Sequence, residues 1–286
     1  MDTIADFLKK IKQPPNPKTL YHYTSQEGLL GIIKDRSIRA TDINFLNDSK
    51  EFSIGQELIE DVLKKSKFNL GSIQIDESKN SLIDGLLKVL KSEIIKTYVC
   101  SFSEKKDELS QWRGYCSNDI GFSLGFNVCK MLECTKSEKG ILLQCQYKES
   151  NQREIIETVI ETWSTYECSK KLLNQETIKS EDKKKCIHLL FLMLFRIAPL
   201  LKHESFYEEA EWRLVFIDTK QMKFRPGKSM IIPYINFDLA DNPFDSIYHS
   251  PTPHRELAKD SLDRLLETNE FNSCITYNSS VPYRNY

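Results

Sequence analysis

Residues 20–51 read LYHYTSQEGLLGIIKDRSIRATDINFLNDSKE, and this segment decides how the chain is interpreted. Its first four residues alternate and are rich in aromatic side chains, which is typical of a β-strand. Thr24 and Ser25 are both natural helix N-cap residues, and the apolar residues after them recur at helical spacing, so a helix is predicted over 26–34. A second strand is expected over 37–41. The unit places His22 at the end of a strand beside a helix N-terminus, where anions bind readily.

Composition sets limits on the class of protein. The chain has 286 residues, of which 40% are hydrophobic and 28% charged, and its net charge is −1. We expect a single domain over 1–286 with an ordinary core. The near-neutral charge gives no global field that favours nucleic acid or membranes. The eight cysteines are scattered without a CxxC pair, so no metal site is predicted. The absence of a signal peptide or a long apolar run predicts a cytoplasmic protein with no membrane contact.

The order of the expected elements favours an α+β fold. Short strands gather toward both ends of the chain and helices lie between them, which favours a mixed, mainly antiparallel sheet over a regular βαβ array. Two long helical patterns are interpreted as a helical insertion or subdomain at about 150–205. Helices are expected over 1–12, 49–65, 82–96, 109–115, 153–173, 181–202 and 253–267. Strands are expected over 97–103, 120–126, 141–147, 206–217, 229–237, 244–249 and 274–278.

Familiar catalytic motifs are missing from the sequence. It has no Walker or Rossmann glycine loop, no HExxH and no GxSxG. Three other patterns remain, namely the strand-end histidine, a Ser-x-Ser at 101–103 with both hydroxyls on one side of a strand, and a Glu-x-Glu at 209–211 on one strand face.

Together these side chains suit cleavage of a glycosidic bond. A carboxylate stabilises an oxocarbenium-like state, a nearby hydroxyl orients the carboxylate, and an aromatic face holds a planar leaving group. The plain structural alternatives are a packed strand histidine at His22 and a solvated strand edge on which Glu209 and Glu211 pair with Arg213.

A polar group follows the opening unit and has two interpretations. Asp48 or Ser49 can cap the next helix, with Glu51 completing a capping box. Alternatively, Asn47, Asp48 and Glu51 belong to a loop over the cleft that contacts an acceptor. The sequence leaves both open.

The chain resembles a bacterial family described as a domain of unknown function. The motifs that carry the resemblance run in order across nearly the whole chain. They are YHYT at 21–24, LND at 46–48 with Glu51, SFS at 101–103, QWRGY at 111–115, GFSLGF at 121–126, EAEWRLV at 209–215 and SVPYR at 280–284. Membership in this family implies no activity.

The segment 20–40 is also similar, more distantly, to the opening motif of DarT-like and RNA 2′-phosphotransferase-like proteins of the ADP-ribosyltransferase superfamily. This resemblance implies an ADP-ribosyltransferase-like sheet and NAD as the substrate. His22 would bind a ribose of NAD, with Tyr23 and Thr24 of the same motif beside it. The strand SFS resembles the superfamily's Ser-Thr-Ser strand, so Ser101 or Ser103 would orient the catalytic acid.

The segment Glu-Ala-Glu resembles the superfamily's Glu-x-Glu strand. Glu211 would hold the nicotinamide ribose and stabilise the oxocarbenium state, and Glu209 would activate or position the acceptor. Trp112 or Tyr115 would stack on nicotinamide. No metal is implied.

The resemblance implies a bacterial toxin or phage-defence effector that transfers ADP-ribose to a protein or nucleic acid, with an antitoxin or defence partner. Hydrolysis of NAD would use the same site. A different class of function is a non-catalytic module in which His22, Trp112, Tyr115 and Arg213 recognise a nucleotide or a nucleic-acid end. A purely structural domain is the third alternative.

Overall fold

A computed structural model describes residues 16–46, 49–68, 70–73, 81–90, 96–115, 120–135, 140–217, 222–227, 229–239, 241 and 243–282. Within these residues the chain is α+β with a mixed, mostly antiparallel open sheet, which confirms the predicted fold class. The helix expected over 1–12 lies outside the described residues. No helix in the described part combines the length and the apolar character needed to cross a membrane.

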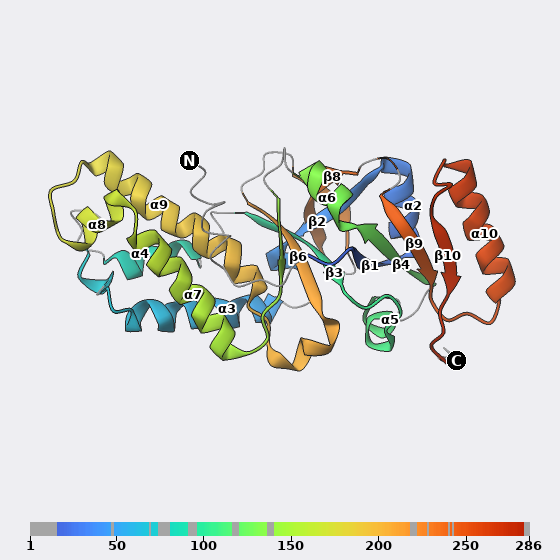
Figure 1. Ribbon diagram of the computed structural model, residues 1–286, viewed down its shortest axis with the longest axis horizontal. Coiled ribbons are helices and arrows are strands. Elements are labelled where there is room, and N and C mark those ends of the chain that lie inside the picture. The colour runs from blue at the N-terminus through green and yellow to red at the C-terminus, as the bar shows by residue number, and fades with distance from the viewer. Residues whose placement is uncertain are drawn as a thin grey trace.

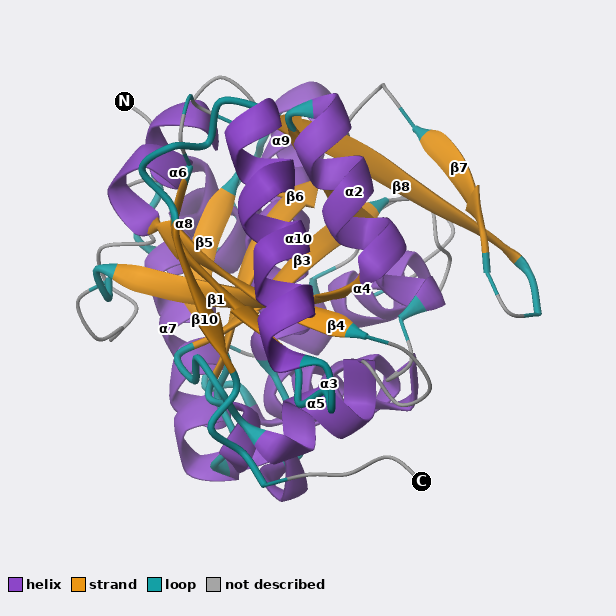
Figure 2. Cartoon of the chain, turned by 90° about the vertical axis from the view of Figure 1, so that its right-hand side faces the viewer, coloured by secondary structure: helices purple, strands orange, loops and turns teal. Residues whose placement is uncertain are grey.

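The described strands form one sheet (Figure 1). They are β1 (Thr19–Ser25), β2 (Ser37–Asp42), β3 (Thr97–Ser103), β4 (Gly121–Asn127), β5 (Ile141–Gln144), β6 (Glu211–Ile217), β7 (Lys223–Pro226), β8 (Ile231–Asp238), β9 (Phe244–His249) and β10 (Ile275–Asn278). The order is β10-β9-β4-β1-β3-β2-β8-β7, and β6 pairs with both β3 and β5. Only β9 and β10 pair in parallel among these strands. The β7–β8 hairpin forms one edge and extends away from the body of the molecule (Figure 2).

The helices fall into two groups. Apolar side chains of α2 (Gln26–Asp35), α6 (Val128–Thr135) and α10 (Arg255–Thr268) join the sheet in one core. The second core is mainly helical. It contains α3 (Ser49–Lys65), α4 (Leu82–Leu90), α7 (Glu149–Ser164), α8 (Glu167–Leu173) and α9 (Ser180–Ile197). A short helix, α5 (Leu109–Tyr115), follows β3.

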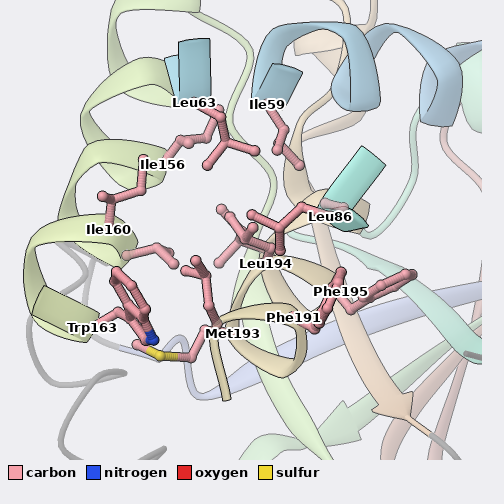
Figure 3. Packing of buried hydrophobic residues seen from close by; sticks show 14 of the residues in the cluster. Ile59, Leu63, Leu86, Ile156, Ile160, Trp163, Phe191, Met193, Leu194 and Phe195 are labelled. Atoms are coloured by element: carbon pink, nitrogen blue, oxygen red, sulfur yellow. The ribbon is translucent and has the colours of Figure 1, made fainter. Parts of the chain in front are cut away.

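Packing in the helical core joins segments that are far apart in sequence. Figure 3 shows Ile59 and Leu63 of α3 facing α7 and α9, with Leu86 of α4 against them. The Trp163 indole N–H donates to the backbone carbonyl of Cys186 at 2.9 Å, which ties α7 to α9. Helices α7 to α9 follow β5 and precede β6 in the chain, and their apolar side chains share one core with those of α3 and α4.

Two of the expected elements differ in the structure, and two further elements were not predicted. The single helix expected over 153–173 is divided into α7 and α8, because the Thr165 hydroxyl and N–H both bond the Thr162 carbonyl and turn the chain. The start of the strand expected over 206–217 is a 3₁₀-helix, η4 (Glu204–Glu209). The elements α6 and β7 were not predicted, since β7 is four residues long and carries only one apolar side chain besides its proline.

Candidate functional site

A cavity of about 980 Å³ opens where the sheet divides. Strand β1 pairs with β3 only at Tyr21 and Ser103, whereas β2 pairs with the other end of β3, through Thr41 with Val99. Among the described strands none pairs with the middle of β3 on that side. The cavity is lined by residues of β1, α2, β2, β3, α5 and the β7–β8 hairpin. The divided sheet therefore brings the opening unit and the SFS strand to one site.

His22 links the two sides of this division. Its Nδ1 atom lies 2.9 Å from the backbone carbonyl of Ser101. A carbonyl oxygen only accepts, so Nδ1 carries the proton and donates. Burial lowers the pKa of His22, against the opposing effect of this hydrogen bond. The imidazole is therefore neutral near pH 7, and Nε2 is the ring nitrogen without a proton, which leaves it able to accept a hydrogen bond.

The two serines of the SFS strand both line the cavity. Ser101 lies opposite Arg213, and Ser103 lies opposite Glu211. The Ser103 hydroxyl donates to the backbone carbonyl of Glu209 at 2.7 Å and accepts from the Lys105 N–H at 3.0 Å. Ser103 thus positions the acidic segment through its backbone.

The two glutamates do not share a strand face, and this prediction was wrong. Glu209 ends η4, and Ala210 has a left-handed φ of 44° before β6 begins at Glu211. Such a conformation costs an alanine roughly 1 kcal/mol. The turn at Ala210 nevertheless brings both carboxylates to the same cation, and both residues line the cavity.

That cation is Lys202, which was not among the predicted site residues. Its Nζ atom lies 2.5 Å from Glu209 Oε2 and 2.7 Å from Glu211 Oε2. Glu211 is also held by Arg213, with Nε 2.8 Å from Oε1 and Nη2 3.1 Å from Oε2. Lys202 and Glu211 are 1% and 4% exposed. Arg213 does pair with a glutamate, as the structural alternative supposes, but in the interior and not on a solvated edge.

The chain folds locally in a way that delivers Lys202 to this point. The helix expected to reach residue 202 ends at Ile197, because Pro199 follows and cannot continue it. Lys202 then runs beside Gln146, whose carbonyl accepts its N–H at 3.1 Å. The Pro199 carbonyl accepts from Arg213 Nη1 at 2.6 Å, so the same segment holds both cations of the cluster.

The four side chains Lys202, Glu209, Glu211 and Arg213 form what we call the ion cluster. Burial by itself raises the pKa of Glu211, but Arg213 and Lys202 outweigh it and lower that pKa to about 2. Burial lowers the pKa of Lys202, and the charge of Glu211 outweighs it and raises that pKa. Glu211 is therefore a carboxylate and Lys202 an ammonium group at neutral pH.

The ion cluster predicts a loss of stability in acid. Because the folded-state pKa of Glu211 lies below the ordinary value of 4.5, its contribution is complete above about pH 4.5 and is lost as the pH falls toward 2. The contribution is about 3 kcal/mol. We expect Glu211→Gln to unfold more easily than wild type by that amount at pH 6 and by much less below pH 3, in denaturant titrations. A difference that does not change with pH would contradict this assignment.

The aromatic residues divide into a structural pair and an exposed ring. Tyr23 is buried, and its hydroxyl donates to the Lys105 carbonyl at 2.8 Å. Trp112 packs edge-on against Tyr23, with ring centroids 4.8 Å apart, and is not part of the cavity lining. Tyr115 lines the cavity and is 44% exposed. Of the two rings expected to stack on a ligand, the structure brings Tyr115 to the cavity. Thr24 also lines it.

Asp107, which was not among the predicted residues, connects Trp112 to the C-terminal segment that contains Ser279 and Ser280. Its carboxylate accepts from the Trp112 indole N–H at 2.8 Å, the Ser279 hydroxyl at 2.6 Å, and the N–H and hydroxyl of Ser280 at 2.7 and 2.8 Å. This explains the first serine of the SVPYR motif. The last two residues of that motif, 283 and 284, lie outside the described residues.

We expect Asp107→Ala to lower the free energy of unfolding by about 2 kcal/mol, because the hydrogen-bond donors that now contact the Asp107 carboxylate would lose their charged acceptor. Asp260→Ala is the control, since Asp260 is exposed on α10 and, within the described part of the chain, forms a surface ion pair with Arg264. Urea titration of both variants tests this. Equal midpoints for the two would show that the Asp107 contacts contribute nothing to stability.

Other predicted residues fall elsewhere. Asn47 and Asp48 lie outside the described residues, and of Glu51 only its place in α3 is described. Within the described part of the chain, no group of three or more His, Cys, Asp or Glu side chains is arranged to hold a metal ion.

No curated protein and no solved structure matches the chain. The predicted resemblance to a family of unknown function is confirmed between α5 and β6, a stretch that contains QWRGY, GFSLGF and EAEWRL and leaves the other motifs outside. Residues 111–214 match the model of the protein family of unknown function DUF2971.

Proposed function

We propose that this protein is an ADP-ribosyltransferase-like enzyme that binds NAD in the cavity and cleaves its nicotinamide–ribose bond. One observation carries the proposal: His22, the SFS strand and Glu209–Glu211, which are distant in sequence, all line one cavity at the division of the sheet. A volume of about 980 Å³ lies at the large end of the range for ligand sites, which suits a dinucleotide.

Each residue has a role in the proposed reaction. His22 accepts a ribose hydroxyl at Nε2, and Tyr115 offers a ring face to the nicotinamide. The bond between the ribose C1′ and the pyridinium nitrogen breaks, and its electron pair leaves with neutral nicotinamide. Glu211, ionised above about pH 2, faces the positive charge that develops on the ribose. Glu209, whose side chain is 22% exposed, takes the role of meeting an acceptor that attacks C1′.

The first experiment is incubation of purified protein with NAD while released nicotinamide is followed. Release by wild type that vanishes in Glu211→Gln supports the proposal. Recovery of free ADP-ribose marks the NAD glycohydrolase form, and ADP-ribose bound to a protein or nucleic acid marks the transferase form. If wild type gives neither nicotinamide release nor stabilisation by NAD, the proposal fails. The toxin or phage-defence setting, a cytoplasmic location and an antitoxin or defence partner belong to this same proposal.

The ion cluster favours a second candidate, a non-catalytic nucleotide-binding module. Lys202 and Arg213 already neutralise the two glutamates, which weakens the field that a carboxylate exerts on an oxocarbenium ion. A module of this kind binds NAD or a nucleotide through His22 and Tyr115 and releases no nicotinamide. Binding that survives Glu211→Gln, with no turnover in either protein, identifies it.

A further inference from the structure

Two arginines line the cavity apart from the ion cluster, Arg39 on β2 and Arg225 on β7. Strand β8 lies between them, and they pair with its residues Asn236 and Ile232. These partners are four residues apart, so both arginines belong to the same face of the sheet. The Arg39 guanidinium lies over the ring of Tyr234, 5.1 Å from its centroid, which directs it along that face.

The two guanidinium groups lack carboxylate partners among the described residues. The ion pairs in the described part involve other cations. Burial, and then the charge of Arg39, lower the pKa of Arg225. Glu27 and Asp35 also line the cavity and pair with neither arginine. Two positive charges thus repel each other in a concave site.

Helix α2 leaves room for Arg39. A side chain at Gly31 would begin 3.4 Å from Arg39 Nη2, so the guanidinium lies close against the helix at a position with no side chain. The first turn of α2, with Ser25 and Gly28, lines the same cavity. Arg39 is therefore held between Tyr234 and α2, on the side of the cavity that the opening unit forms.

We propose that Arg39 and Arg225 bind the diphosphate of a nucleotide ligand. The inference rests on the proposed function, since it states how the same cavity holds the central part of NAD. Guanidinium groups match phosphate oxygens in bidentate geometry, and two of them suit two linked phosphates. A bound diphosphate would also remove the repulsion between the two arginines.

The test is titration calorimetry with ADP, adenosine and inorganic pyrophosphate. We expect Arg225→Gln and Arg39→Gln each to weaken ADP binding by about tenfold and to leave adenosine binding within about twofold of wild type. The affinity for pyrophosphate should fall in both variants by about the same factor as the affinity for ADP. Lys88→Gln is the charge-matched control, because Lys88 is exposed on α4 and lies outside the cavity lining. Arg225→Lys keeps the positive charge but loses the bidentate guanidinium geometry, so its ADP affinity should lie between those of wild type and Arg225→Gln. Melting curves without ligand show that each variant is folded.

The outcomes separate this inference from the proposed function. Nicotinamide release by wild type, together with equal ADP affinity in wild type and both glutamine variants, overturns the diphosphate site and leaves the enzyme proposal standing. Arginine-dependent binding of ADP and pyrophosphate without nicotinamide release supports the diphosphate site and removes the enzyme proposal. Wild type that binds neither ADP nor pyrophosphate overturns the diphosphate site.

Discussion

Replacing Lys202 by methionine should lower the free energy of unfolding by about 3–5 kcal/mol. Methionine has nearly the same length and volume, so the change removes the charge and leaves the packing close to that of wild type. Glu209 and Glu211 then face each other with Arg213 as the remaining cation of the cluster. Because Lys202 and Glu211 are buried, water replaces the lost ammonium group poorly. Guanidinium titration followed by circular dichroism measures the effect.

Lys67→Met is the matched control. Lys67 also contacts a carboxylate, Glu161 at 2.5 Å, but its side chain is 68% exposed, so a change of no more than about 1 kcal/mol is expected. The double variant Lys202→Met, Glu209→Gln restores charge balance in the cluster and should recover part of the loss. If Lys202→Met and Lys67→Met unfold at the same denaturant concentration, the ion cluster is not a source of stability.

Replacing Glu211 by glutamine should reduce the rate of nicotinamide release by about 100-fold or more while the Kd for NAD stays within about threefold. Glutamine keeps the shape of the side chain and removes the negative charge that the positive transition state requires. Under the proposed function, ground-state binding depends on His22, Tyr115 and the other residues that line the cavity, and the substitution changes none of these side chains. Steady-state kinetics and calorimetry, carried out well below the melting temperature of the variant, measure the two quantities separately.

Glu208→Gln is the control for this prediction. Glu208 is an exposed neighbour on η4 and is not part of the cavity lining, so its replacement should leave turnover unchanged. Turnover that persists in Glu211→Gln would remove Glu211 from the reaction. If turnover and NAD affinity fall by the same factor, Glu211 has a structural role in the site, through its ion pairs with Lys202 and Arg213.

Local physics made the strand–helix–strand unit predictable. Alternating aromatic residues, a serine that accepts the Gly28 N–H at the N-cap, and apolar residues at helical spacing are short-range signals, and β1 and α2 begin within one residue of their expected starts. The same reasoning placed β3 correctly, and both of its serines line the cavity. Where a residue type has an uncommon backbone conformation, the short-range signal fails, and the left-handed Ala210 is the example.

The sequence by itself determined the α+β class, the opening unit and the motifs that line the cavity, because periodicity, capping and β-propensity act over a few residues. Only the tertiary structure decided that β1 and β2 separate along β3, that Lys202 is buried between two glutamates, and that Arg39 and Arg225 share a face across β8. These features depend on strand register and on contacts between distant segments. No short-range sequence signal identifies the role of Lys202, because a lysine near the end of a helical pattern is ordinarily solvated. Only tertiary packing around Lys202 buries its ammonium group and so strengthens its interaction with the two glutamates.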